Sequence, residues 1–378
     1  MKELLSFAAF IATFISLYGL LNYYFYRKAA GCISCKSWGK ALPAAFLLLM
    51  VFAPFLVNFA SAAGLHNVAL VSAWIGYTWM AAVFLFFCVH AAVDIVSVVR
   101  WIFLRISGRS RAVFERRRAV FAISAAMVSA ALAWGFLEAR TIRIEHVGIY
   151  SDKLSEPVRI AHLSDLHFGV MNGERFAAKV ARLLEEINAD IVVSTGDMID
   201  RGLADFEGTA AVLRGVTAAA GKYAVAGNHE FYTGIEKSAE FHEKSGFTFL
   251  RNSAVFVSDR LTIAGVDDPA GRRYGINPDF FERRLLDGVP PERFTLLLKH
   301  QPVPAAGYDL QLSGHTHGGQ IFPFNFIVGM VYPRVRGFHE LECGCSMYIS
   351  RGTGFWGPPL RLFAPPEITV IEIRPEES

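Results

Sequence analysis

The chain has 378 residues, 53% of them hydrophobic, and its mean hydropathy of +0.34 is high for a wholly soluble protein. Of its 37 basic and 34 acidic residues, 14 and 5 respectively lie in residues 1–150. The remainder is therefore acidic overall, which argues against nucleic acid as its partner.

Four apolar runs are each long enough to cross a bilayer as a helix: 4–26, 41–63, 68–93 and 119–137. The first has no charged residue and is too long for the apolar core of a cleavable signal. The short connector 64–67 predicts a tight helical hairpin, and Pro54 should kink its helix. Residues 1–145 thus form the predicted membrane region.

Arginine and lysine in the loops predict the orientation of this region. Loop 27–40 carries four basic residues and loop 94–118 seven arginines, whereas connector 64–67 has neither residue type. The positive-inside rule places both basic loops in the cytoplasm. With four spans in the inner membrane, everything after Leu137 is expected outside the cytoplasm. The triplet Arg116–Arg118 before the last run also resembles a twin-arginine export signal, which leads to the same location.

The five cysteines predict no disulfide framework. Cys343 and Cys345 are separated by one residue, a spacing expected to strain a mutual bond. Cys32 and Cys35 form a single CxxC motif, and a zinc site would need two further ligands. We interpret this pair as free thiols.

From residue 158 the pattern changes to short buried runs that end in polar turns. Strands are predicted at 158–163, 191–195, 223–226, 261–266, 295–299 and 310–313. Between the first two, residues 174–188 place apolar side chains at helical spacing. A strand, a helix and a strand at this length indicate an α/β fold with a parallel pair.

Five short segments at the ends of these strands carry metal-binding residue types. They are Asp165-Leu166-His167, Gly196-Asp197-Met198-Ile199-Asp200, Gly227-Asn228-His229-Glu230, Lys299-His300 and Gly314-His315-Thr316-His317. Carboxylate, amide and imidazole together suit manganese, iron or zinc. Alternate residues of an extended segment point to one side, so each Asp-x-His or His-x-His pair should converge. His162, His242 and His339 fit no motif and are interpreted as structural, and Asp267-Asp268 as a turn.

The ordered pattern DxH, GDxxD, GNH[DE], H and GHxH resembles the calcineurin-like metallophosphoesterase superfamily. The resemblance implies a four-layer αββα sandwich over residues 155–374, preceded here by four transmembrane helices. It also implies two metal ions. Asp165, His167 and His317 would hold the first, Asn228, His300 and His315 the second, and Asp197 would bridge them. His229 would be the general acid, supported by Asp200.

Further residues resemble the membrane-linked bacterial branch of that superfamily: the segment 314–320 (GHTHGGQ), Ser350-Arg351-Gly352, Arg361 and Pro365-Pro366-Glu367. Some relatives there hydrolyse UDP-2,3-diacylglucosamine. Arg351 and Arg361 would bind substrate phosphate or pair with internal acids. Tyr232 would line the substrate groove or pack inside.

The expected function is therefore that of a membrane-anchored phosphoesterase acting on a phosphodiester, pyrophosphate or phosphomonoester, with the bilayer and a lipid- or envelope-linked substrate as partners. One alternative is a pyrophosphatase of lipid A synthesis. Others are a membrane sensor or transporter with a regulatory domain, and a metal-binding module without turnover. Only His90 is ionisable well inside a span, which disfavours transport, and an intact His229 disfavours a pure binding module.

Overall fold

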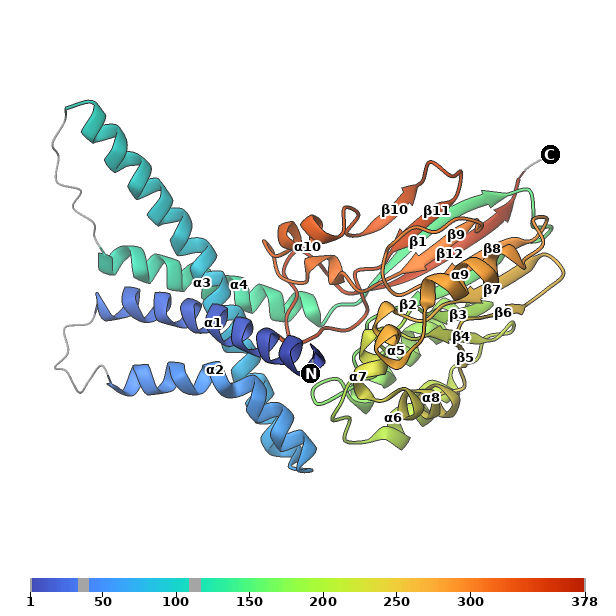
Figure 1. The fold of residues 1–378 in the computed structure, drawn as a ribbon, viewed down its shortest axis with the longest axis horizontal. Helices are drawn as coiled ribbons and strands as arrows, with labels where there is room; N and C mark the ends of the chain where they lie inside the picture. Colours follow the sequence, from blue (N-terminus) through green and yellow to red (C-terminus); the bar gives the residue numbers. More distant parts are fainter. Residues whose placement is uncertain (1, 33–40, 109–116, 377–378) are drawn as a thin grey trace. The chain divides into compact units, whose positions relative to one another are not determined.

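The computed structural model describes residues 2–32, 41–108 and 117–376. The chain divides into two compact units, Met1–Phe136 with Gly357–Pro359, and Leu137–Trp356 with Leu360–Ser378 (Figure 1). Cys35 and Arg116, which belong to the CxxC and triple-arginine motifs, lie outside the described residues.

The first unit is built from helices: α1 (Lys2–Ala30), α2 (Ala41–Ala62), α3 (His66–Ile106) and α4 (Arg117–Ala139). Within the described residues, α2, α3 and α4 are long and apolar enough to cross a membrane. The predicted span 4–26 falls inside α1 and stays a prediction. Helix α3 has 41 residues and continues through the first part of the predicted loop 94–118.

Helices α2 and α3 form the predicted hairpin. A Cβ atom on Gly76 would lie 2.6 Å from the Cβ of Ala53, so the two helices approach closely at small residues, as membrane helices often do. Pro54 lies inside α2, and the ribbon of α2 bends along its length (Figure 1).

Polar side chains in this unit pair with one another. His90 Nδ1 lies 3.1 Å from Ser124 Oγ, and Trp79 donates to Asn22 over 2.9 Å. Lys28, near the end of α1, forms a 2.6 Å ion pair with Asp94 in α3. The stretches where loops 27–40 and 94–118 begin are therefore adjacent.

The second unit contains two six-stranded mixed sheets. The first has the order β1-β12-β2-β3-β4-β5 and the second β10-β11-β9-β8-β7-β6. The first consists of β1 (Arg143–Ser151), β12 (Glu367–Pro375), β2 (Val158–Leu163), β3 (Ile191–Ser194), β4 (Lys222–Val225) and β5 (Thr248–Leu250). The second consists of β10 (Gly337–Glu340), β11 (Ser346–Ile349), β9 (Leu310–Ser313), β8 (Phe294–Leu298), β7 (Leu261–Gly265) and β6 (Ser253–Phe256).

Parallel pairing dominates the centre of each sheet. Strands β2 to β5 are parallel neighbours, and so are β7, β8, β9 and β11. Antiparallel pairs occur at β12–β2, β10–β11 and β6–β7. The six predicted strands are all present, within one residue at either end. The other six, including β1, were not predicted, and the first sheet begins at Arg143 rather than at residue 155.

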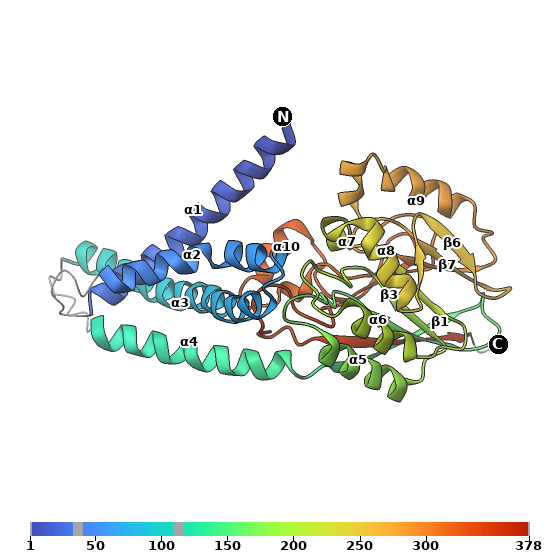
Figure 2. The same cartoon turned by 90° about the horizontal axis from the view of Figure 1, so that it is seen from below.

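Buried clusters show how the layers pack. Ile160, Val193, Ile263 and Leu296 belong to one cluster that joins the facing surfaces of the two sheets. The outer face of the first sheet packs against α5 (Glu174–Ile187), α6 (Phe206–Gly215) and α8 (Ile235–Lys244). Helix α9 (Pro278–Asp287) packs on the second sheet and lies on the side opposite α5 and α6 (Figure 2).

The remaining short helices are η2 (Pro269–Tyr274), α7 (Asn228–Thr233), η3 (His317–Gly319) and α10 (Asn325–Val331). Three of these helices lie at or close to the ligand segments in sequence. Helix α7 begins at Asn228, η3 begins at His317, and α10 begins six residues after η3 ends.

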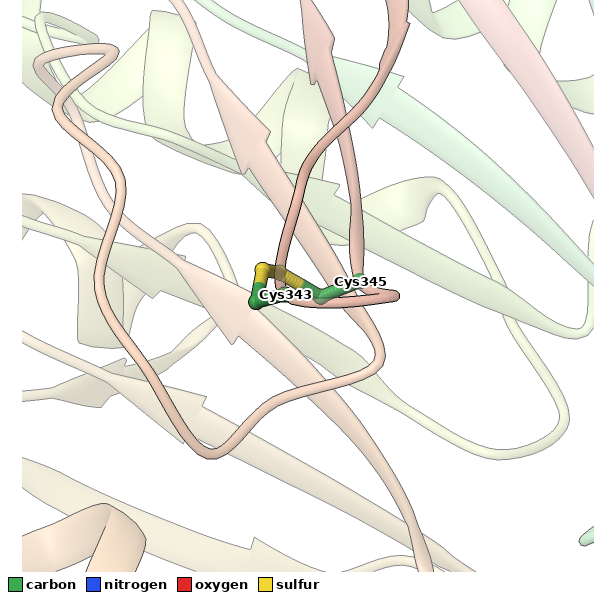
Figure 3. Close-up of a disulfide and its surroundings, with 2 residues drawn as sticks. All are labelled: Cys343 and Cys345. Atoms are coloured by element: carbon green, nitrogen blue, oxygen red, sulfur yellow. A yellow bond between two sulfur atoms is a disulfide. The ribbon is translucent and has the colours of Figure 1, made fainter.

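The prediction that Cys343 and Cys345 stay unpaired was wrong. They form a disulfide across the turn between β10 and β11 (Figure 3). Gly344 lies between them with φ of 75°, which folds the chain so that the two Cα atoms are 5.3 Å apart. That separation suits a disulfide, and an extended segment would have exceeded it. Cys32 and Cys88 are free.

Candidate metal centre

All seven predicted ligands follow the carboxyl ends of parallel strands drawn from both sheets. Asp165 and His167 follow β2, Asp197 follows β3, Asn228 follows β4, His300 follows β8, and His315 and His317 follow β9. Because these strands are parallel within each sheet, their carboxyl ends meet at one edge of the sandwich, where loop residues converge.

The first cluster joins Asp165, His167 and His317, whose potential ligand atoms all lie within 4.8 Å of one another. Nε2 of His317 is 3.1 Å from Nε2 of His167 and 3.3 Å from an oxygen of Asp165. Neighbouring atoms that bind one ion at about 2.0–2.1 Å lie roughly 2.8–3.4 Å apart, from octahedral to tetrahedral geometry. These separations therefore match a shared cation.

The second cluster joins Asp197, His300 and His315. Nε2 of His300 is 3.1 Å from Oδ2 of Asp197 and 3.2 Å from Nδ1 of His315. The same oxygen of Asp197 lies 3.9 Å from Nε2 of His167. Asp197 thus stands between the two clusters, where a bridging carboxylate would be needed.

Asn228 supplies an independent sign of a bound cation. Its amide oxygen is buried and has no hydrogen-bond partner among the described residues. A buried acceptor without a partner costs about 1–3 kcal/mol, and a cation bound by this oxygen would remove that cost. The residues therefore fit the two metal ions that the sequence pattern implies.

The ligand pairs converge for a reason that differs from the predicted one. Asp165 and His167 have φ of 53° and 49°, and His315 and His317 have φ of 69° and 51°. They are left-handed turn residues, so the argument from alternating sides of an extended strand was wrong. Asp197 has φ of 50° as well. Such conformations cost roughly 1–3 kcal/mol each and gather at functional sites, where the surrounding fold holds them.

Two glycines make room for the carboxylates. A Cβ atom on Gly227 would lie 2.2 Å from Oδ1 of Asp197, and one on Gly314 would lie 2.3 Å from Oδ2 of Asp165. Neither glycine has a positive φ. These two positions therefore require glycine for space.

The electrostatics of the clusters favour a cation. Burial raises the pKa of Asp165 and Asp197, but nearby histidines outweigh it and hold both pKa values below the usual range. Burial lowers the pKa of His315 to about 4, and it lowers the pKa of His317 well below the usual value. Burial also lowers the pKa of His300, but Asp197 outweighs it and raises this pKa well above the usual value. Ionised carboxylates and neutral imidazoles are the forms that bind metals, so His300 would lose a proton on binding, whereas His315 and His317 would not.

His229 and Asp200 lie beside the clusters and contact each other. Nδ1 of His229 donates to Oδ1 of Asp200 over 2.6 Å, and Nδ1 of His167 donates to the same oxygen over 3.0 Å. Nε2 of His229 lies 4.0 Å from Oδ2 of Asp197. Burial lowers the pKa of His229, but Asp197 and Asp200 outweigh it and raise the pKa to about 9. The distances also admit His229 as a metal ligand together with His167 and Asp197.

Glu230 is a functional residue that the sequence reasoning missed. Its buried carboxylate accepts hydrogen bonds from the backbone N–H groups of Gly227, Asp197 and Met198 at 2.7, 2.9 and 2.7 Å. It thereby ties the loop that carries Asp197 to the loop that carries Asn228. Its place in the GNHE segment was the available signal.

Arg351 and Arg361 do not lie free to bind substrate. Arg351 forms 2.5 Å ion pairs with Glu145 and Glu367, so it takes the alternative of pairing with internal acids. Arg361 is fully buried and donates to the backbone oxygens of Arg351 and His317 at 2.6 and 3.0 Å. The expectation of a phosphate contact is wrong for Arg361, whose guanidinium instead supports the segment that carries His317.

Aromatic side chains border His229. The rings of Tyr232 and Trp356 have centroids 5.5 and 5.6 Å from that of His229. Tyr232 is 42% exposed and Trp356 is 56% exposed, so both reach solvent beside the site. The sequence reasoning left Tyr232 open and missed Trp356, since a lone tryptophan between Phe355 and Gly357 has no recognisable pattern.

The histidines and aspartates that fit no motif make hydrogen bonds, ion pairs or ring contacts with neighbouring residues. His162 is buried beside Thr195 at 2.8 Å, His242 stacks on Phe249, and His339 contacts a backbone oxygen. Asp267 pairs with Arg251, and Asp268 caps η2 by accepting from the N–H of Ala270.

Comparisons with known proteins agree with this geometry. Residues 158–319, which include all seven ligand candidates, match the model of the calcineurin-like phosphoesterases. The chain is 37% identical over 249 residues to an uncharacterized metallophosphoesterase of Aquifex aeolicus, covering 64% of this chain and 95% of that protein. The chain belongs to the calcineurin-like metallophosphoesterase family.

Two further relatives cover more of this chain, and the first of them includes its N-terminal helices. An uncharacterized metallophosphoesterase of Campylobacter jejuni is 28% identical over 375 residues, 95% of this chain and 96% of that protein. A transmembrane protein with metallophosphoesterase domain from Danio rerio is 31% identical over 274 residues, 67% of this chain and 62% of that protein. The apolar helices and these relatives together indicate that this metallophosphoesterase is associated with a membrane.

Proposed function

We propose that the chain is a membrane-anchored hydrolase that cleaves a phosphate ester with two transition-metal ions, manganese, iron or zinc, at the clusters around Asp197. The observation that carries the proposal is the position of this carboxylate between two groups of ligand atoms at coordination spacing, with the unpartnered oxygen of Asn228 beside them. Bound cations would lower the pKa of a water molecule and stabilise charge on the phosphoryl oxygens.

The protein side chains would divide the remaining work. Donation by Nδ1 of His229 to Asp200 orients the ring and leaves Nε2 directed toward Asp197. In its protonated form this imidazole can give a proton to the leaving oxygen. Asp200 also fixes His167, whose Nε2 then remains available as a ligand. Tyr232 would lie against the leaving group beside His229.

The test is turnover of bis-p-nitrophenyl phosphate by the full chain in detergent micelles, with and without manganese. Metal-dependent hydrolysis that Asp197→Ala abolishes is the expected result. The matched control is Asp267→Ala, since Asp267 is equally buried but pairs with Arg251 away from the ligands. Absence of turnover with every metal tried, or equal turnover after Asp197→Ala, would refute the proposal.

The same proposal places four helices in the inner membrane and the catalytic domain outside the cytoplasm. The ion pair between Lys28 and Asp94 supports it, because it holds the starts of both basic loops at one face of the membrane. The disulfide of Cys343 and Cys345 supports it as well, since disulfides persist in oxidising compartments. A lipid- or envelope-linked phosphate ester is the substrate class that fits this location.

A further inference from the structure

Helix α10 is apolar, yet its side chains face solvent. Its sequence is NFIVGMV, and none of its residues is buried. Phe326 is 65% exposed, Met330 77% and Val331 70%. Soluble proteins rarely display several large apolar side chains on so short a segment unless a partner covers them.

The exposed surface continues beyond the helix. The ring of Phe322 lies 5.7 Å from that of Phe326 and 5.8 Å from that of Phe363, and Phe363 is 61% exposed. We call this surface the apolar rim, and it consists of Phe322, Phe326, Ile327, Met330, Val331 and Phe363.

The apolar rim borders the metal centre. Helix α10 starts six residues after η3. A Cβ atom added to Gly319 would lie 2.4 Å from the Cα of Asn325, the first residue of α10. Tyr332, directly after α10, places its ring 5.3 Å from that of His315. A surface that binds the apolar rim would therefore lie next to the metal ligands.

The apolar rim also lies where the chain enters the domain from α4. The N–H of Phe363 donates to Glu138, in the last turn of α4, over 2.7 Å, and the N–H of Arg143 donates to Pro366 over 2.8 Å. Helix α4 ends at Ala139 and β1 starts at Arg143. Three intervening residues span at most about 10 Å, so this edge of the domain stays close to the bilayer that α4 crosses.

Basic side chains follow the helix. Arg334 and Arg336 come within five residues of its end, and the guanidinium of Arg336 donates to the backbone oxygen of Phe363. Apolar side chains next to arginines are the combination that binds the boundary between lipid headgroups and acyl chains.

We propose that the apolar rim docks into the surface of the same bilayer that holds α4, with Phe326, Met330 and Val331 among the acyl chains. The metal centre then faces ester groups carried on lipids in that leaflet. The docking itself rests on the exposed surface and the short connection, whereas the statement about substrate rests on the proposed function.

Docking is tested by placing a fluorescent probe on the apolar rim. The full chain with Cys32, Cys35 and Cys88 changed to Ser is labelled at Met330→Cys under non-reducing conditions and reconstituted in phosphatidylcholine and phosphatidylglycerol vesicles. The control site is Phe256→Cys, because Phe256 is 63% exposed but lies in β6, at the edge of the second sheet opposite β10. Brominated lipids are expected to quench the probe at position 330 and not at 256, and aqueous iodide to do the reverse.

Two results would overturn the docking. Equal quenching by iodide at both positions would show that the apolar rim stays in water. Protection of position 330 from both quenchers would show that a second copy or the helices of the chain itself cover it.

A second measurement separates the docking from the hydrolysis. The double variant Met330→Ser/Val331→Ser should keep its rate on soluble bis-p-nitrophenyl phosphate within about twofold. It should lose about tenfold on a p-nitrophenyl phosphodiester carried by a lipid in the vesicles, because fewer apolar contacts hold the site at the surface. Equal rates of variant and wild type on the vesicle ester would contradict the proposal. An inactive wild type would refute the proposed function and leave the quenching result to decide the docking.

Discussion

At the scale of single residues, the metal centre depends on backbone conformations that are costly for the side chains that occupy them. Asp165, His167, Asp197, His315 and His317 all have φ between 49° and 69°. Asp and His tolerate this region better than branched residues do. The hydrogen bonds that Glu230 accepts from the loops around Asp197 and Gly227 help to hold the strained segments in place.

Substitution of His229 distinguishes a role of this residue in catalysis from a role in metal binding. We expect His229→Ala to retain the metal content of the wild type and to lose about 10²–10⁴-fold in turnover, because general acid catalysis typically contributes that much. Metal content is measured by mass spectrometry on the full chain in detergent, and turnover with bis-p-nitrophenyl phosphate. Loss of metal in this variant would assign His229 to the ligands instead, as the grouping with His167 and Asp197 also allows.

Substitution of Gly227 tests whether the space beside the Asp197 carboxylate can hold a larger side chain. Gly227→Ala would bring a methyl group to 2.2 Å from Oδ1 of Asp197, so Asp197 must shift. We expect loss of metal binding and a fall of roughly 1–3 kcal/mol in the free energy of unfolding. Gly148→Ala is the matched control, since a Cβ atom there meets nothing within 4 Å. Unchanged metal affinity in Gly227→Ala would show that the loop relaxes freely.

At the scale of elements, the site requires strands from two sheets to end at one edge. Strands β2, β3 and β4 bring Asp165, Asp197 and Asn228, whereas β8 and β9 bring His300 and His315. The buried cluster between the sheets therefore controls the distance between the two groups of ligands. Helices such as α5 and α8 support the site only from behind, through the outer face of the first sheet.

Helix α8 carries a pH-dependent contribution to stability that is independent of the metal centre. Burial lowers the pKa of His242 to about 4, although its bond to the backbone oxygen of Ser238 opposes the shift. In the unfolded chain the His242 imidazole takes up a proton near pH 6.5. The contribution of neutral His242 to the free energy of unfolding is therefore fully present above that pH and is lost as the pH falls toward 4. The loss attributable to His242 is about 3 kcal/mol.

His242→Phe should remove this contribution, because a phenyl ring can keep the stacking on Phe249 without titrating. Urea unfolding of the full chain in micelles at pH 7.5 and 4.5, with chelator present in every sample, measures the difference. The wild type should lose more stability than the variant between the two pH values. Parallel losses would show that His242 is not responsible.

At the scale of the whole molecule, a membrane region and a metallophosphoesterase domain share one chain. Alkaline phosphatase, which is active only outside the cytoplasm, tests the proposed orientation when fused after Leu137, with a fusion within the predicted loop 94–118 as its control. We expect activity from the first and none from the second, because arginine-rich loops stay inside. The opposite pattern would place the domain in the cytoplasm.

The residue types of the candidate site and the strands nearest to it could be predicted from the sequence alone. Asp, Asn and His recur in ordered motifs, and the structure brings six of the seven candidates, all except Asn228, into two clusters. The strand runs 158–163 and 191–195 are mostly apolar and are each followed by a polar turn, a pattern that needs no tertiary information. Strand β1 was missed because its side chains alternate only weakly, and its place depends on pairing with β12, more than 200 residues away.

The way in which these residues meet, and the side chains that surround them, depend on how the whole domain folds. The left-handed turns at Asp165 and His315, the burial of Arg361 and the bond between Cys343 and Cys345 all follow from neighbours distant in sequence or from local backbone angles. The apolar rim is the clearest case. The apolar residues at 322–331 are equally compatible with a helix in the core of the domain. In the folded domain they are exposed, near His315 and next to the end of α4.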